Sequence, residues 1–125
     1  MRRAPTPIPA DPEDARKAAY GIALRLLAGR EMSSGRLRER LGSRGFPDDL
    51  NEAIVDRLTR AGILDDRRAA LAAARTLVAV KQRGRHRVAR ELERLGFTKE
   101  QAQDATEAVL ADTDERAVIA RVVAS

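Results

Sequence analysis

The sequence contains no cysteine, and its only histidine is His86. The lack of cysteine excludes disulfide bonds and thiolate metal sites, which is compatible with a reducing cytosol. No apolar run approaches the roughly 20 residues that are needed to span a bilayer, and the N-terminus has no stretch typical of a signal peptide. We therefore expect a soluble, cytoplasmic protein without a metal ion or any other cofactor.

Aromatic residues are almost absent as well, since Tyr20, Phe46 and Phe97 are the whole set. The apolar residues are mainly Ala, Leu and Val, which build thin cores between closely packed helices. The chain is rich in good helix formers and poor in residues that fill sheets, so the sequence predicts an all-α fold. Its 125 residues leave room for one domain or a short helical array.

Acidic residues are missing from one long segment. From Arg67 to Arg90 there are eight Lys or Arg residues and no Asp or Glu, although the whole chain has a formal charge of only +5. The rest of the chain therefore carries a net charge of −3. A basic block in an otherwise balanced chain favours a polyanionic partner, most often nucleic acid.

Comparing the chain with itself reveals a repeat with an offset of 51 residues. The offset places Leu37, Leu41, Gly45 and Phe46 on Val88, Leu92, Gly96 and Phe97, and Tyr20, Ala23 and Leu27 on Leu71, Ala74 and Val78. Within each copy, apolar residues recur at the spacing of helices. The sequence predicts three helices per copy, over 13–28, 34–44 and 48–61 and then over 66–81, 85–95 and 99–111.

These helices predict an elongated array of tandem three-helix repeats. Residues 1–12 contain four prolines and are expected to form a flexible lead-in. The first repeat is assigned to 13–62, the second to 63–112, and the first helix of an incomplete third repeat to 113–125. The apolar residues of this last segment are the expected contact if the chain self-associates, but the sequence leaves the oligomeric state open.

Helix signals support this division. Gly45 and Gly96 stand where a helix end needs a left-handed residue, and the phenylalanine after each can fold back on the last turn. Gly62 closes the third helix in the same way. Thr98 and Gln101 have the spacing of a capping box at the start of the sixth helix.

Several of these residues together resemble the RecX family, bacterial proteins that modulate the RecA recombinase and consist of tandem three-helix repeats. The resemblance covers residues 17–120 and rests on Leu37-Arg38-Glu39-Arg40-Leu41, Gly45-Phe46-Pro47, Gly62-Ile63-Leu64-Asp65-Asp66, Gly84, Val88-Ala89-Arg90-Glu91-Leu92 and Gly96-Phe97. The chain departs from the family at Ile63 and at Ala69 or Ala70, where an aromatic residue is usual, and in its nearly absent third repeat.

The resemblance implies a function as well as a fold. It implies that the chain binds the groove of a RecA-type recombinase filament on DNA. Binding there would modulate the recombinase, with inhibition as the expected effect, in DNA repair and the SOS response. The expected partners are the filament and single-stranded or duplex DNA, with no membrane involved.

The basic segment supplies the candidate binding residues. A rotation of about 100° per residue puts Val88, Leu92 and Leu95 on one side of the helix over 85–95 and three arginines on another. The cations just before that helix lie in a loop where Gly84 would let the backbone approach a phosphate closely. The predicted nucleic-acid or filament-binding residues are Lys81, Arg83, Arg85, Arg87, Arg90 and Arg94.

The first repeat gives an internal comparison for these arginines. It keeps Arg36 at the position of Arg87, but Glu39 and Ser43 replace Arg90 and Arg94. A solvated helix face explains the same arginines without any partner, although a charge needed only for solubility has no reason to be confined to one repeat.

Other functions stay open at this point. One alternative is a freestanding DNA-binding protein that uses helix 85–95 as the recognition helix of a helix-turn-helix unit. Another is a helical scaffold that binds no nucleic acid. Catalysis is not expected, because the chain lacks a phosphate loop, zinc spacing and a nucleophile with its base. Asp65 and Asp66 are read as helix caps, and His86 receives no special role.

Overall fold

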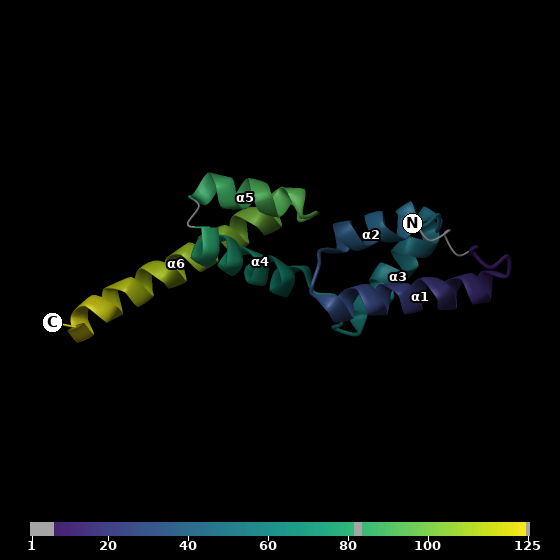
Figure 1. The fold of residues 1–125 in the computed structure, drawn as a ribbon, viewed down its shortest axis with the longest axis horizontal. Coiled ribbons are helices and arrows are strands. Elements are labelled where there is room, and N and C mark those ends of the chain that lie inside the picture. The colour runs from purple at the N-terminus through teal and green to yellow at the C-terminus, as the bar shows by residue number, and fades with distance from the viewer. Residues whose placement is uncertain (1–6, 82–83, 125) are drawn as a thin grey trace, which may run out of the picture. The chain divides into compact units, whose positions relative to one another are not determined.

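The computed structural model describes residues 7–81 and 84–124 (Figure 1). These residues form six α-helices and no strand, which confirms the predicted all-α class. The helices are α1 (Pro12–Gly29), α2 (Ser34–Ser43), α3 (Asp48–Arg60), α4 (Asp66–Lys81), α5 (Arg85–Arg94) and α6 (Lys99–Ala124). The chain divides between Asp65 and Asp66 into two compact units, and each unit contains three of the helices.

The helix bounds follow the 51-residue offset closely. Helices α2 and α5 correspond residue for residue, and α3 and α6 begin at equivalent positions. Gly45 and Gly96 both have the positive φ that was predicted, 95° and 97°. The backbone N–H of Phe46 donates to the Leu41 carbonyl at 3.3 Å, and that of Phe97 to the Leu92 carbonyl at 3.2 Å. Each phenylalanine therefore turns back onto its helix and is buried.

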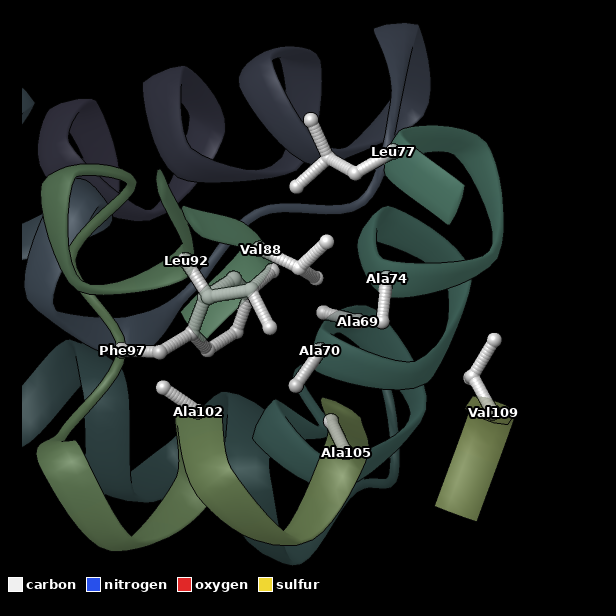
Figure 2. Close-up of a cluster of buried hydrophobic side chains, with 10 residues drawn as sticks. All are labelled: Ala69, Ala70, Ala74, Leu77, Val88, Leu92, Phe97, Ala102, Ala105 and Val109. Carbon is white, nitrogen blue, oxygen red and sulfur yellow. The ribbon is translucent and has the colours of Figure 1, made fainter. Parts of the chain in front are cut away.

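Each unit has its own apolar core. The first is formed by Ala19, Ala23, Leu37, Leu41, Phe46, Ile54, Val55, Leu58 and Leu64. In the second, side chains from α4, α5 and α6 converge around Phe97, and five alanines allow the helices to approach closely (Figure 2). The buried side chains of α4 are Ala69, Ala70, Ala74 and Leu77. Leu71 and Val78, which the repeat pattern indicated, are only half-buried.

The start of α6 is fixed by the predicted capping box. The Thr98 N–H donates to Gln101 Oε1 at 2.9 Å, and the Gln101 N–H donates to Thr98 Oγ1 at 3.1 Å. The Gln101 side chain also donates to Asp66 Oδ2 at 3.3 Å, which connects α6 to the first residue of α4. One glutamine thus supports the starts of two helices.

The C-terminal part of the chain differs from the prediction. We expected a helix over 99–111 and a separate helix over 113–125, but α6 runs without a break from Lys99 to Ala124. The repeat explains the difference, because Gly62, whose φ of 74° follows the end of α3, is replaced by Thr113 in the second copy. Thr113 Oγ1 donates to the Val109 carbonyl at 2.9 Å, and Arg116 pairs with Asp112, so nothing stops the helix.

Part of the predicted lead-in belongs to the first unit. Asp11 caps α1 by accepting the N–H groups of Glu13 and Asp14 at 2.8 and 3.2 Å. Pro12 is the first residue of the helix, where a missing N–H carries no cost. Ile8 also packs against the first core. The prediction of a flexible segment therefore does not hold for Ile8, Asp11 and Pro12.

Candidate nucleic-acid interface

Helix α5 is held against the second unit by a narrow apolar side. Val88 and Leu92 are fully buried, and four residues of spacing place them one above the other. Leu95, which was predicted to join them, is 40% exposed. The reason is that α5 ends at Arg94 and Leu95 is its C-cap, so the chain turns at Gly96 and Phe97 fills the core instead.

Three arginines stand on the opposite side of α5. Arg87, Arg90 and Arg94, with Glu91, line an open surface hollow of about 440 Å³. We call these three residues the arginine face. Their side chains are exposed to solvent. Arg94 Nη1 lies 3.4 Å from Glu91 Oε1, and within the described part of the chain Arg90 has no ion pair. The face therefore keeps a net positive charge.

Arg85, another of the candidates, does not join the arginine face. Arg85 is exposed on another side of α5, where it lines a different groove. Lys81 is the last residue of α4, but its side chain lies outside the described part of the structure, as does all of Arg83. Their predicted role stays a prediction.

Gly84 was expected to lie in a loop where the absence of a side chain matters, but the structure shows no such requirement. It is the N-cap of α5, with an extended backbone (φ −71°, ψ 167°) that any residue can adopt. A side chain at this position would meet open space. No side chain caps α5, whereas the equivalent Ser33 accepts the Arg36 N–H at 3.0 Å at the start of α2. Neither conformation nor packing therefore requires a glycine here.

The equivalent surface of the first unit is different in charge. Arg36, which corresponds to Arg87, lies 3.9 Å from Glu39, and its side chain is only 29% exposed. Ser43 Oγ, at the position of Arg94, donates to the Arg40 carbonyl at 2.9 Å. The arginine face is thus confined to the second unit, as the repeat predicted.

The structure also contains a groove that sequence reasoning missed. It lies between α5 and α6 and has a volume of about 740 Å³. We call it the α5–α6 groove; its lining residues are Arg85, His86, Ala89, Arg90, Glu93, Lys99, Gln103, Thr106 and Glu107. The signal that was available is the repeat itself, since Ala89 and Gln103 replace the charged residues Arg38 and Glu52 of the first unit.

The described residues hold no cluster of three or more His, Asp or Glu side chains that is suited to a metal ion. Asp65 and Asp66 stand at the start of α4, where caps were predicted, and Asp66 accepts the hydrogen bond from Gln101. His86 is exposed at the edge of the α5–α6 groove. None of the helices in the described part of the chain is long and apolar enough to cross a membrane.

Comparison with known proteins identifies the family. Residues 19–58 match the family profile described as "RecX, first three-helix domain". The regulatory protein RecX of Mycobacteroides abscessus is 37% identical over 99 residues, which are 79% of this chain and 48% of that protein. The chain belongs to the RecX family. The regulatory protein RecX of Trichlorobacter lovleyi is 36% identical over 77% of this chain and 62% of its own length.

A solved RecX structure has the same fold. The crystal structure of RecX from Lactobacillus salivarius matches with a TM-score of 0.71 at 22% identity, over 74% of this chain and 60% of that one. The chain spans about half the length of the mycobacterial RecX relatives, 48% of the protein of Mycobacteroides abscessus and 55% of that of Mycolicibacterium vanbaalenii. The relatives are named regulatory proteins, which agrees with the predicted non-enzymatic role. The family profile matches in the first unit, whereas the arginine face lies in the second.

Proposed function

We propose that this RecX-family chain binds a RecA-type recombinase filament on DNA and inhibits its recombinase activity. It acts in the bacterial cytoplasm as a regulator of DNA repair and of the SOS response. The arginine face of α5 contacts DNA phosphates or acidic groups of the filament. Lys81, Arg83 and Arg85 are further contacts of the proposed interface.

The observation that carries this proposal is the division of α5 into two sides. Val88 and Leu92 are buried in the second core, so the helix cannot rotate, and Arg87, Arg90 and Arg94 are fixed toward solvent. Phosphate contacts require only positive charge, whereas base readout commonly adds Asn, Gln, Ser or Thr to the arginines. The exposed side of α5 has none of these four residue types. This composition favours backbone contacts over sequence reading.

The test is a charge reversal on the arginine face. The variant R87E/R90E/R94E is compared with R40E/R44E/R60E, which makes the same charge change at three exposed arginines of the first unit. Binding to RecA filaments on single-stranded DNA is measured beside naked single-stranded and duplex DNA, in a salt series, and strand exchange is followed in parallel. Circular dichroism checks that both variants stay helical.

We expect the arginine-face variant to lose filament binding and inhibition, while the control variant keeps both. Equal losses in the two variants would mean that net charge alone matters. Unchanged binding by the arginine-face variant would refute the assignment of this face. A preference of the wild-type chain for a particular duplex sequence would favour the helix-turn-helix alternative instead.

A further inference from the structure

The lining of the α5–α6 groove includes two positions at which the repeats differ in charge. In the first unit, Arg38 of α2 pairs with Glu52 of α3, and its Nη2 donates to Glu52 Oε2 at 3.4 Å. The same two positions hold Ala89 and Gln103 in the second unit, and both line the groove. The ion pair that connects two helices in one copy has thus been replaced by a small residue and a neutral one in the other.

The walls of the groove have changed charge as well. Lys99 stands at the position of Asp48 in the first unit, and Arg90 at that of Glu39. Arg85 and His86 replace a serine and a glycine. Within the described part of the chain, none of the three cations Arg85, Arg90 and Lys99 makes an ion pair. Their positive charge is therefore available to an anionic group that enters the groove.

The groove is nevertheless a poor track for nucleic acid. Glu93 and Glu107 line it together with the cations, and a phosphodiester backbone following the groove would be repelled by both carboxylates. Ala89 adds apolar surface. A mixture of both charges beside a small apolar side chain is complementary to a protein segment, in which an acidic side chain can meet Arg90 while neighbouring polar or basic groups meet the glutamates.

We propose that the α5–α6 groove binds the protein component of the filament, through a segment that presents at least one acidic side chain to Arg85, Arg90 and Lys99. This inference rests on the proposed function and assigns the two components of the filament to two different surfaces of the second unit. The arginine face contacts DNA, the groove contacts protein, and Arg90 lies at the border of both. A helix that binds DNA on one side and protein on another selects a nucleoprotein filament over either component alone.

The variant A89R/Q103E tests the proposal by installing in the second unit the ion pair that Arg38 and Glu52 form in the first. It fills the groove, leaves the net charge unchanged and does not alter the arginine face. The matched control T76E/A79R places the same two charges on exposed positions of α4. Each variant is titrated with filaments, with naked single-stranded DNA and with DNA-free recombinase, and circular dichroism monitors folding.

We expect A89R/Q103E to bind naked DNA like the wild-type chain and to lose binding to the free recombinase. Its binding to filaments should be about tenfold weaker, which corresponds to a loss of about 1.4 kcal/mol of binding free energy. The control variant keeps all three. Unchanged filament and recombinase binding by A89R/Q103E overturns the proposal. So does an equal loss on naked DNA, because the groove would then serve the nucleic acid.

Photocrosslinking gives a second readout that does not depend on filling the groove. A benzoylphenylalanine replaces Gln103 in the groove or, as the control, Glu52 at the equivalent position of the first unit. An adduct between position 103 and the recombinase polypeptide supports the proposal, and an adduct with DNA contradicts it.

The binding experiments also separate the failure of the two proposals. If the wild-type chain binds free recombinase but no filament, the proposed function fails. A loss of recombinase binding by A89R/Q103E would in that case still support the proposal that the groove binds protein. If the wild-type chain binds neither form, both proposals fail.

Discussion

Replacing Arg87, Arg90 and Arg94 by Ala is expected to weaken the salt dependence of binding to single-stranded DNA. Each phosphate neutralised on a single strand adds about 0.7 to the slope of log K against log salt concentration, so three contacts amount to about 2. The structure ranks the contributions. Arg90 has no ion pair among the described residues and should contribute about 0.7 alone, whereas Arg94, 3.4 Å from Glu91, should contribute less.

The same geometry predicts a gain of binding. The Glu91 carboxylate competes with phosphate for Arg94, so Glu91→Gln should raise the affinity for DNA. The Arg94 side chain is 79% accessible and that of Glu91 is 27% accessible, and pairs with one solvent-exposed partner are worth about 1 kcal/mol. The expected gain is therefore no more than about fivefold and should disappear at high salt.

Fluorescence anisotropy with a labelled oligonucleotide, in a series of salt concentrations, measures both effects. The control is R40A/R44A/R60A, which removes three exposed arginines of the first unit and should leave the slope unchanged. A slope that does not change in the R87A/R90A/R94A variant would refute phosphate contact by this face. A loss of affinity in Glu91→Gln would show that this carboxylate supports binding rather than opposing it.

Three further predictions concern the fold and are checked by denaturant unfolding and amide hydrogen exchange. Gly96→Ala should destabilise the protein by about 1–2 kcal/mol because Gly96 has a φ of 97°, whereas Gly21→Ala in the middle of α1, where a side chain meets open space, should stabilise it by up to about 1 kcal/mol. The opposite order would contradict the backbone assignment. Thr98→Ala should cost about 1 kcal/mol through loss of the capping box, with no loss expected if the box is absent in solution. Thr113→Gly should raise amide exchange beyond residue 113 by several-fold, since glycine in a helix interior costs about 1 kcal/mol, and unchanged exchange would refute the explanation given for the length of α6.

Much of the fold was predictable because local signals and the repeat agree. Gly45 and Gly96 each require a backbone conformation that only glycine adopts easily, and each is followed by a phenylalanine that must be buried. The same glycine and phenylalanine occur in both repeats, and in each repeat they mark the end of one helix and the start of the next. The bounds of α2 and α5 are therefore close to the prediction, within one residue at their ends.

What the sequence did not show depends on contacts between helices. Helical periodicity places Leu95 on the buried side of α5, but the helix stops one residue earlier and Phe97 takes the space. The α5–α6 groove is lined by Ala89 on one helix and Gln103 on the next, which are 14 residues apart in the chain. No pattern within a single helix contains this pair; the repeat shows that both positions differ from the first unit, and the tertiary structure shows that they line one groove.

The comparison between the two units also separates residues that maintain the fold from residues that are free to bind. Helices α2 and α5 share their bounds and the glycine and phenylalanine that follow them, so exchanging Glu39 for Arg90 or Arg38 for Ala89 left the backbone unchanged. Exchanging Glu39 for Arg90 adds a cation that makes no ion pair among the described residues, while the scaffold stays the same, so the exchange brings no ion-pair stabilisation. Like charges on one helix face repel one another at a small cost, which agrees with the proposed contact between the arginine face and an anionic partner.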